Sequence, residues 1–580
     1  MDNFISTFNI VLEAINDVLW HEAALYAILG CGILFTLWSG FSQFRALTHG
    51  VGITAGKYDD PNDPGAINHF QALSTALSAT VGIGNIGGVA TAVALGGPGA
   101  VFWMWVVGFF GMALKTTEVT LAMLYRNTED PENPHGGAMW VADKGFAELF
   151  PNVHWLGKLL AGLFCITLLI ATITGGNMFQ AFNVAEVTAT NFPGLQDHLN
   201  ALGGSENGSF LNVKLATGIV LSIFTALVVI GGIKRIGHVA AALVPFMCGI
   251  YLIASLYVII VHLGDIPALL GSIFAAAFAP AEAQGAFLGG AAGSAFAWGM
   301  KRALFSNEAG QGSAPIAHSA AKTDEPVREG LVAGLEPFID TIVVCTLTAL
   351  VILASGVWNR EAVTTLPADT GIVAAKPAAS ASNQPAPAAA GWTVSVLELP
   401  AKASGEPWIE RESLFVIVDS PEHGELRRLT GTVKFAGDKA MVEWEAFDTK
   451  ERPTLKGNEV FGNYIGAALT SQAFDRVVPG MGTWMVSLAV WLFAFSTIIS
   501  WNYYGEQGSL YLFGARSILW YRLFYCVCVV IACSGFITTD RELDNLTNLG
   551  TGVMLAANLP ILLIFGRRTM GAYHEYLRRF

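Results

Sequence analysis

Apolar residues fall in long runs along this chain, and short polar or glycine-rich connections separate them. Eleven runs are long enough to cross a bilayer, which takes roughly 20 residues of helix. They cover residues 22–44, 70–95, 99–125, 157–186, 211–231, 237–262, 284–305, 330–355, 483–504, 517–537 and 544–566. The pattern predicts an all-α polytopic membrane protein with about 11 transmembrane helices.

The second run is interrupted at its centre. Val81-Gly-Ile-Gly-Asn-Ile-Gly-Gly88 holds four glycines within the seven residues that follow Val81. Glycine costs about 1 kcal/mol relative to alanine inside a helix, so we expect the span to unwind here. Broken backbone at this depth is tolerated where it lines a cavity or is buried in protein. A close-packed small-residue helix is the alternative, and the polar Asn85 favours the broken one.

Basic residues fall in every second connection, although only 13% of the residues are charged and 53% are hydrophobic. These connections carry Arg45, Lys57, Arg126, Lys144, Lys158, Lys234, Arg235, Lys322, Arg328, Arg516 and Arg522, and Arg567, Arg568, Arg578 and Arg579 follow the last run. Basic connections stay on the cytoplasmic side. We therefore expect a multi-pass protein of the bacterial inner (plasma) membrane, with its N-terminus outside and its C-terminus cytoplasmic.

Spans two to six and spans seven to eleven make two sets of five. An odd number of spans inverts the second set relative to the first, and inverted repeats with matching broken helices are the layout of many secondary transporters. The scheme requires span seven to be broken as well, and Phe305-Ser-Asn-Glu-Ala-Gly-Gln-Gly-Ser-Ala-Pro315 interrupts its apolar run. The alternative is a cytoplasmic loop after a complete span.

Residues 357–478 differ from the rest of the chain. Ala374 to Ala390 is rich in Ala, Pro and Ser, as flexible linkers are, and short alternating segments such as 414–418, 431–435 and 442–445 predict strands. We expect a small β-rich extracytoplasmic insertion. The predicted domains are a leading helix and cytoplasmic loop (1–68), the first five-helix repeat (69–262), the start of the second (263–356), the insertion (357–478), the rest of the second repeat (479–566) and a cytoplasmic tail (567–580).

Four motifs in order resemble the alanine or glycine:cation symporters, the sodium:alanine symporter family. They are Val81-Gly-Ile-Gly-Asn85, Gly96-Gly-Pro-Gly-Ala-Val-Phe-Trp-Met-Trp105, Phe305-Ser-Asn-Glu-Ala-Gly310 and Phe493-Ala-Phe-Ser-Thr-Ile-Ile499. The resemblance covers about residues 20–356 and 480–566. It implies the inverted five-plus-five fold of the neurotransmitter:sodium symporters with one extra leading helix. Two positions depart from the family pattern: Ile83 stands where Thr is usual, and Gln311 where Leu or Met is usual.

The resemblance implies sodium-coupled import of alanine, glycine or another small neutral amino acid by alternating access, with Na⁺ as the co-transported ion. A proton-coupled or glutamine-type permease is one alternative, and a membrane receptor that senses amino acids through the insertion is another. An enzyme is not expected, because the membrane part holds no defensible nucleophile–base pair, metal-ligand cluster or nucleotide-binding loop. The expected partners are the amino acid and the lipid bilayer, without nucleic acid.

A zwitterion in low dielectric needs a partner for each charge. At the first break the N–H groups of Ile83 and Gly84 can take the carboxylate, helped by the dipole of the following half-helix. The ammonium would meet Ser306, Asn307 and Glu308 at the second break, which also contains Gly310. Glu308 has a structural ion pair as its alternative role. Trp501 either walls this pocket or anchors its helix at the lipid interface.

Sodium needs several oxygen ligands, and we expect the Asn85 side chain, Thr80 and the substrate carboxylate to supply them. A shared carboxylate would couple ion and substrate, because each would raise the affinity of the other. The resemblance implies a second sodium site, with the carbonyl groups of Ser78 and Val81 and the hydroxyl groups of Ser496 and Thr497. For the two hydroxyl groups, helix–helix contact or bonding to the preceding turn is the alternative.

Three further polar residues stand in or beside apolar runs. Lys115 and Glu118 lie three residues apart, close enough to pair on one helical face. We interpret them as a buried structural pair rather than a proton relay. His69 precedes the broken span and is expected to be a solvated residue at its end.

Overall fold

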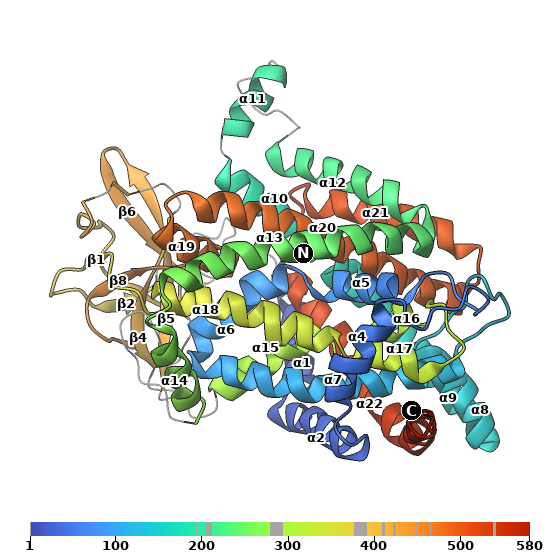
Figure 1. Ribbon diagram of the computed structural model, residues 1–580. Coiled ribbons are helices and arrows are strands. Elements are labelled where there is room, and N and C mark those ends of the chain that lie inside the picture. The colour runs from blue at the N-terminus through green and yellow to red at the C-terminus, as the bar shows by residue number, and fades with distance from the viewer. Residues whose placement is uncertain are drawn as a thin grey trace.

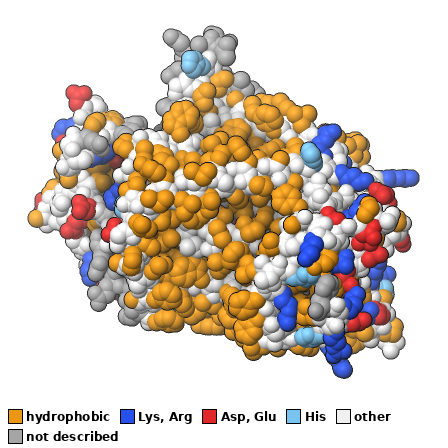
Figure 2. Space-filling view, viewed as in Figure 1, with side chains coloured by type: hydrophobic (Ala, Val, Ile, Leu, Met, Phe, Trp, Pro, Cys, Tyr) orange, Lys and Arg blue, Asp and Glu red, His pale blue; other side chains and the backbone are white. Residues whose placement is uncertain are grey.

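The computed structural model describes residues 2–579 except 193, 204–211, 279–293, 376–390, 406, 409–411, 421–424, 448, 450, 465 and 538–540. Long helices run side by side through most of the molecule, and the β-strands gather at one end of them (Figure 1). A broad hydrophobic band crosses the helices, while Lys, Arg, Asp and Glu lie at the two ends, most densely at the end opposite the strands (Figure 2). This distribution is the one expected of helices that lie in a bilayer.

The helices of the first half of the chain are α1 (Asp2–Leu19), α2 (Glu22–Trp38), α3 (Ser42–Arg45), α4 (Val51–Thr54), α5 (His69–Thr80), α6 (Val89–Gly96), α7 (Gly99–Tyr125), α8 (Ala138–Leu149), α9 (His154–Ile173), α10 (Phe179–Asn191), α11 (Gly194–Gly203), α12 (Val213–Val229), α13 (Gly232–Val261) and α14 (Ile266–Ala276). The second half holds α15 (Ser294–Asn307), α16 (Ala314–His318), α17 (Pro326–Ala333), α18 (Thr346–Ser355), α19 (Ala467–Val477), α20 (Met481–Phe513), α21 (Ser517–Ala532) and α22 (Arg541–Leu577). π-Helical turns occupy Ala46–Gly50, Gly84–Gly88, Thr174–Met178 and Phe338–Cys345, and short 3₁₀ turns occupy Pro151–Val153 and Val357–Asn359.

The helical polytopic architecture predicted from the apolar runs is confirmed. Among the described residues, seven helical stretches are long and apolar enough to cross a membrane. If the bent pair α5 and α6 is counted as one span, the number of candidate spans is eight. Three shorter apolar helices, α12, α14 and α21, accompany them. The predicted total of 11 spans is therefore not confirmed. Residues 284–293, the start of the predicted seventh span, lie outside the described residues. Helix α1, which the apolar pattern did not predict, packs against α22.

The predicted interruption of the second span is present. Asn68 caps α5 with a reciprocal capping box to Gln71, and α5 ends at Thr80. Val81 then leaves the helical conformation with φ −77° and ψ 88°. The chain resumes as the π-helical turn Gly84–Gly88 and α6, bent by 53° from α5. The helical hydrogen-bond ladder is thus broken where the glycine-rich sequence predicted it.

The seventh span is broken as well. Helix α15 ends at Asn307, and Glu308 takes a left-handed conformation with φ 54°. Gly310 and Gly312, with φ of 87° and 83°, then turn the chain into the short helix α16. The segment from Ser306 to Ala321 is buried, so the alternative of a cytoplasmic loop is wrong. The two interrupted spans lie against each other, through contacts of α15 with α6 and with the turn Gly84–Gly88.

The predicted β-rich insertion is confirmed. Its strands are β1 (Thr364–Thr365), β2 (Ile372–Ala374), β3 (Trp392–Val394), β4 (Ser413–Ser420), β5 (Glu425–Ala436), β6 (Lys439–Trp444), β7 (Thr454–Leu455) and β8 (Glu459–Gly462). The larger sheet has the order β1-β8-β4-β5-β6, with β7 also paired to β4, and its described pairs are antiparallel. Val416, Val433 and Val442 belong to its separate hydrophobic core. Most of the predicted linker, residues 376–390, lies outside the described residues.

Candidate substrate and ion site

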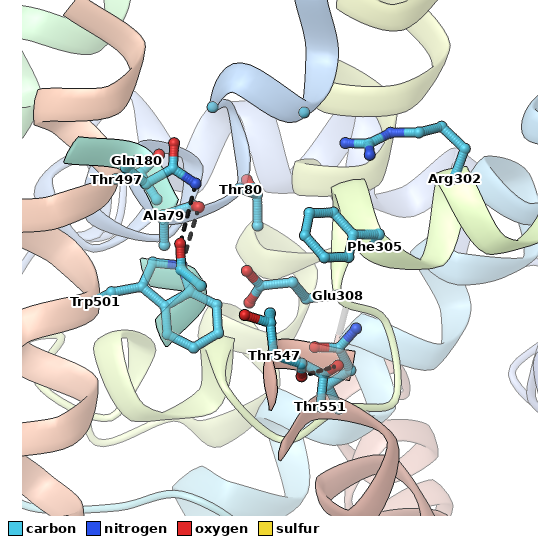
Figure 3. Close-up of a pocket in the computed structure, with 14 residues that line it drawn as sticks. Ala79, Thr80, Gln180, Arg302, Phe305, Glu308, Thr497, Trp501, Thr547 and Thr551 are labelled. Atoms are coloured by element: carbon cyan, nitrogen blue, oxygen red, sulfur yellow. Dashed lines mark hydrogen bonds between the residues drawn. The ribbon is translucent and has the colours of Figure 1, made fainter. Parts of the chain in front are cut away.

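A small cavity lies where the two interrupted spans meet α20 and α22 (Figure 3). Its volume is about 30 Å³, where one water molecule needs about 10–15 Å³. It is lined by Ala79, Thr80, Gly82, Gly84, Gly175, Gln180, Arg302, Phe305, Glu308, Gln311, Thr497, Trp501, Thr547 and Thr551. The cavity therefore suits a compact polar solute of a few non-hydrogen atoms.

The first break supplies one wall of this cavity. Two hydrogen bonds to its backbone stabilise the break. The Gly82 N–H donates to Asn85 Oδ1 at 2.9 Å, and Trp501 Nε1 donates to the Ala79 carbonyl oxygen at 3.2 Å. Trp501 is buried, so it lies in the pocket wall and the interpretation as a lipid anchor is wrong. Of the two predicted carboxylate-binding positions, Gly84 lines this cavity, whereas Ile83 lines only a wider cavity beyond it.

The second break contributes Glu308, whose carboxylate points into the space between Trp501 and Phe305 (Figure 3). The Ser313 hydroxyl group donates to that carboxylate. The other residues predicted at this break do not line the cavity. Asn307 Nδ2 donates to Thr341 Oγ1 at 3.1 Å, and the Gly310 N–H faces Glu118 Oε2 at 3.4 Å. These two residues stabilise the shape of the break from behind.

A buried carboxylate that the sequence analysis missed lies behind the first break. Asp340, in the π-helical turn Phe338–Cys345, accepts a hydrogen bond from Asn85 Nδ2 at 2.5 Å. Asn85 Nδ2 also lies 3.1 Å from Ser306 Oγ. Asp340 makes no ion pair with any residue that the structure describes, and it is fully buried. Unpaired buried carboxylates are costly, so oxygen-rich surroundings of this kind favour a bound cation.

The predicted second sodium site falls between α5 and α20. Ser78 Oγ donates to the Ser496 carbonyl oxygen at 2.7 Å, and Ser496 Oγ lies 3.3 Å from the Ser78 carbonyl oxygen. Thr497 Oγ1 donates to the carbonyl oxygen of Phe493 and lines the cavity. The structure thus brings Ser78, Ser496 and Thr497 to one interface. The hydroxyl groups of Ser496 and Thr497 also donate to the carbonyl oxygen of Phe493 in the preceding turn, as the alternative interpretation stated. Val81 is buried at the end of α5.

Lys115 and Glu118 do not pair with each other, so the predicted pairing is wrong. Lys115 Nζ lies 3.3 Å from Glu336 Oε2, and both side chains are fully buried. Glu118 instead accepts the Gly312 N–H at 2.5 Å and Asn558 Nδ2 at 2.7 Å. Residues three apart share a helical face, but each of these two side chains meets a different neighbouring segment. Glu118 is thereby a fixed anchor for the second break.

Lys115 begins a buried chain of charged groups that leads away from the cavity. Glu336 contacts His318 Nε2 at 2.5 Å, and His318 Nδ1 contacts Glu329 at 2.5 Å. Glu329 also contacts His69. His69 is 1% exposed, so the expectation of a solvated residue is wrong. The chain runs from the centre of the molecule to the first turn of α5.

Several cavity residues were missed because they stand inside apolar runs. Gln180, Thr547 and Thr551 come from α10 and α22, and the spacing of the two threonines, one helical turn apart, was a usable signal. Arg302 was a stronger signal, because an ionisable residue within a transmembrane span usually marks a functional site. Phe305 opens the motif Phe305–Gly310, and its side chain lines the cavity although the motif alone does not assign it there.

A second, wider cavity of about 820 Å³ adjoins the first and shares Gly84, Arg302 and Phe305 with it. Its other walls come from α1, α6, α10, α19 and the start of α22. Gly466, Ala467 and Ala468, which lie between the last strand β8 and the first turn of α19, line it too. The wider cavity is therefore on the strand-bearing side of the molecule, and Arg302 and Phe305 stand between it and the inner cavity.

Comparison with known proteins finds relatives along nearly the whole chain. The profile of the sodium:alanine symporter family matches residues 5–379 and 454–580. The sodium/alanine symporter AgcS of Methanococcus maripaludis is 34% identical over 554 residues, covering 96% of this chain and 94% of that protein. A putative sodium/proton-dependent alanine carrier protein, YrbD of Bacillus subtilis, is 30% identical over 569 residues, covering 98% and 92%. The solved structure of MhsT in complex with L-phenylalanine aligns with a TM-score of 0.48 and 12% identity, over 87% of this chain and 90% of that one.

Proposed function

The chain belongs to the sodium:alanine symporter family, and from this we propose that it imports alanine, or a neutral amino acid of similar size, together with sodium. The observation that carries the proposal is the meeting of two broken spans at a small buried cavity, with the buried carboxylate of Asp340 behind the first break. Within the part of the chain that the structure describes, this carboxylate accepts hydrogen bonds but forms no ion pair. Broken spans offer bare peptide groups to a solute at this depth. A volume of about 30 Å³ favours alanine or glycine over glutamine.

The proposed substrate pose follows from the charges around the cavity. The carboxylate would lie at Gly84, at the start of the half-helix that continues into α6, where the helix dipole favours an anion. The ammonium would lie toward Glu308, the acidic side chain of the cavity wall. Phe305 and Trp501 would close over the small side chain between them.

The proposed first sodium site uses Asp340, with Asn85 and Ser306 beside it and Thr80 at the end of α5. Carboxylate, amide and hydroxyl oxygens are the ligands that a hard cation prefers. The Asn85 oxygen holds the Gly82 N–H in this structure, so sodium would share that oxygen with the break itself. Sodium binding would thereby fix the conformation of the backbone that receives the amino acid. The second proposed site lies at Ser78, Val81, Ser496 and Thr497.

The proposed orientation places the strand-bearing end outside the membrane and the C-terminus in the cytoplasm. Three contacts at the other end of the molecule support this orientation, because they bring basic connections together there. Arg45 donates a hydrogen bond to the Tyr573 hydroxyl group, and Arg568 forms an ion pair with Glu148. Arg579 Nη2 lies 2.9 Å from Glu325 Oε2. Basic segments of this kind favour the cytoplasmic face. The wide cavity would then be the outer vestibule through which the substrate reaches its site.

Uptake of labelled alanine into proteoliposomes tests the proposal. We expect an inward sodium gradient to drive accumulation, and an equal potassium gradient to leave it at the equilibrium level. Excess unlabelled glycine should compete, whereas glutamine should compete weakly. If uptake is independent of sodium but is driven by a pH gradient, the transporter is coupled to protons and not to sodium. A chain that binds alanine without any flux, and loses its response when the β-rich insertion is deleted, would instead be a receptor.

A further inference from the structure

Arg302 stands at the junction of the two cavities and lines both of them. It lies on α15, one turn before Phe305, and its guanidinium group extends toward the broken span from the side opposite Trp501 (Figure 3). The guanidinium carbon lies 4.8 Å from the centroid of the Phe305 ring. A solute at the junction of the two cavities would therefore lie close to this cation.

The glycines of the broken span make room for Arg302. A Cβ atom on Gly84 would lie 2.1 Å from Arg302 Nη2, and a Cβ atom on Gly88 would lie 2.0 Å from the guanidinium carbon. These two glycines are four residues apart and share one face of the half-helix. Their absent side chains let the guanidinium group come close to the backbone at Gly84 and Gly88, beside the position that the proposed function gives to the substrate carboxylate.

Apart from its contact with the Phe305 ring, Arg302 forms no hydrogen bond or ion pair with any residue that the structure describes. Its Nε and Nη2 atoms are buried and make no hydrogen bond. Two carboxylates are near enough to influence it, those of Asp340 and Asp544. Asp340 already holds Asn85, and Asp544 holds Asn548 at 3.1 Å. A buried guanidinium group with open donors is costly, so this arrangement favours an anionic ligand that arrives from outside the protein.

From these contacts we infer that Arg302 recognises the carboxylate of the amino acid, and that it is the residue that makes a free carboxylate obligatory for the substrate. The inference rests on the proposed function. The planar guanidinium fork matches the two oxygens of a carboxylate, and such charge-assisted pairs are stronger than neutral hydrogen bonds. The carboxylate would lie between Arg302 on one side and the N–H groups of the half-helix on the other. An amide or an alcohol in its place would leave the cation unpaired.

Equilibrium binding of labelled alanine to purified protein in detergent, with sodium present, tests the inference. Arg302→Gln should weaken alanine binding about 10- to 100-fold. The wild-type protein should bind alanine far better than alaninamide, which lacks the carboxylate, and Arg302→Gln should bring the two affinities to within about threefold. Arg516→Gln is the matched control, because Arg516 is exposed and lines neither cavity; it should leave alanine affinity and selectivity unchanged.

A second variant displaces the Arg302 guanidinium group without removing it. Gly88→Ala would drive a methyl group into the guanidinium carbon and displace Arg302, so it should lower alanine affinity and selectivity in the same direction. Gly30→Ala, where a Cβ atom meets nothing within 4 Å, controls for the substitution itself. If Arg302→Gln is unstable in detergent, Arg302→Lys keeps the charge without the fork and should still reduce the preference for alanine over alaninamide.

The outcomes separate the inference from the proposed function. A wild-type protein that fails to bind alanine in sodium would overturn the proposed function. A wild-type protein that binds alanine, together with Arg302→Gln and Gly88→Ala variants that keep its affinity and its discrimination against alaninamide, would overturn the role of Arg302 alone.

Discussion

Asn85 Nδ2 and Asp340 Oδ1 lie 2.5 Å apart, and their hydrogen bond joins the broken second span to the span that ends in α18. The same amide group of Asn85 accepts the Gly82 N–H through its oxygen. One side chain thus connects the interrupted backbone to a buried carboxylate. A cation bound at Asp340 would act on the break directly, which links ion occupancy to the shape of the substrate site.

Replacing Asp340 with asparagine should weaken sodium binding. The substitution keeps the size of the side chain but removes the negative charge that would bind the cation, so the sodium concentration for half-maximal alanine binding should rise about tenfold or more. Sodium titration of alanine binding measures this concentration. Asp369→Asn, at an exposed position in the insertion, serves as the control. An unchanged sodium requirement in Asp340→Asn would remove this carboxylate from the ion site.

Lys115 should contribute to stability through its buried pair with Glu336. Breaking a buried ion pair by removing one partner costs about 3–5 kcal/mol, so Lys115→Met should lower the free energy of unfolding by that amount. Thermal unfolding in detergent measures the loss, and the double variant Lys115→Met with Glu336→Gln should recover part of it. The exposed pair of Lys234 and Glu132, with side chains 61% and 76% exposed, offers a contrast: Lys234→Met should cost less than about 1 kcal/mol.

Trp501→Phe should affect substrate binding mildly and selectively. The variant keeps an aromatic wall but loses the hydrogen bond from Nε1 to the Ala79 carbonyl oxygen, which lies in the last turn of α5. Loss of one such bond is worth a factor of about 2–10 in affinity, and the KM for alanine should rise accordingly. Trp484→Phe, on the same helix at a 69% exposed position, should leave KM unchanged. The same rise in both variants would argue against a pocket role for Trp501.

Arg428 should couple the insertion to the broken span. From strand β5, its Nη2 atom donates to the Ala94 carbonyl oxygen in α6 at 3.3 Å, and its guanidinium group covers the Phe415 ring. Burial lowers the pKa of Arg428 to about 10, so the group stays protonated between pH 6 and 9 and the contact should not change over that range. Arg428→Met should slow alanine uptake by a factor of about 2–10 without changing sodium affinity.

The matched control for Arg428 is its neighbour on the same strand. Arg427 points to the other face of the sheet, because successive side chains of a strand alternate. Arg427→Met should leave uptake unchanged at every pH in this range. Equal uptake rates in Arg428→Met and wild-type vesicles would show that the contact with α6 does not influence transport.

The broken spans were predictable because their cause is local. Glycine lowers helix stability wherever it stands, so the glycines between Val81 and Gly88 predict a break in the helix without knowledge of any other part of the chain. Strand β4 was equally visible, since alternating apolar residues need no distant partner to be recognised. What the pattern of Gly84 and Gly88 did not reveal is the second reason for these glycines, the close approach of Arg302 from another span.

The missed contacts depend on residues that are distant in sequence. Lys115 reaches Glu336, which lies more than 200 residues away along the chain, and its helical neighbour Glu118 faces a different segment. Spacing within one helix says which residues share a face, but it does not say what packs against that face. Asp340 was missed for a related reason. It stands in an apolar run, within the π-helical turn Phe338–Cys345, and its importance appears only beside Asn85.

The pairing of β1 with β8 gives the insertion a narrow neck. Thr364 lies opposite Val460 in that pair, and Arg360 Nη1 reaches the Tyr464 carbonyl oxygen at 3.3 Å, so the two ends of the segment meet at one point. A segment tethered in this way can be exchanged as a unit without altering the helices that flank it. A circularly permuted fluorescent protein grafted onto this neck would report movements of α19 and the adjoining half-helix, making the carrier an optical indicator of its own transport cycle.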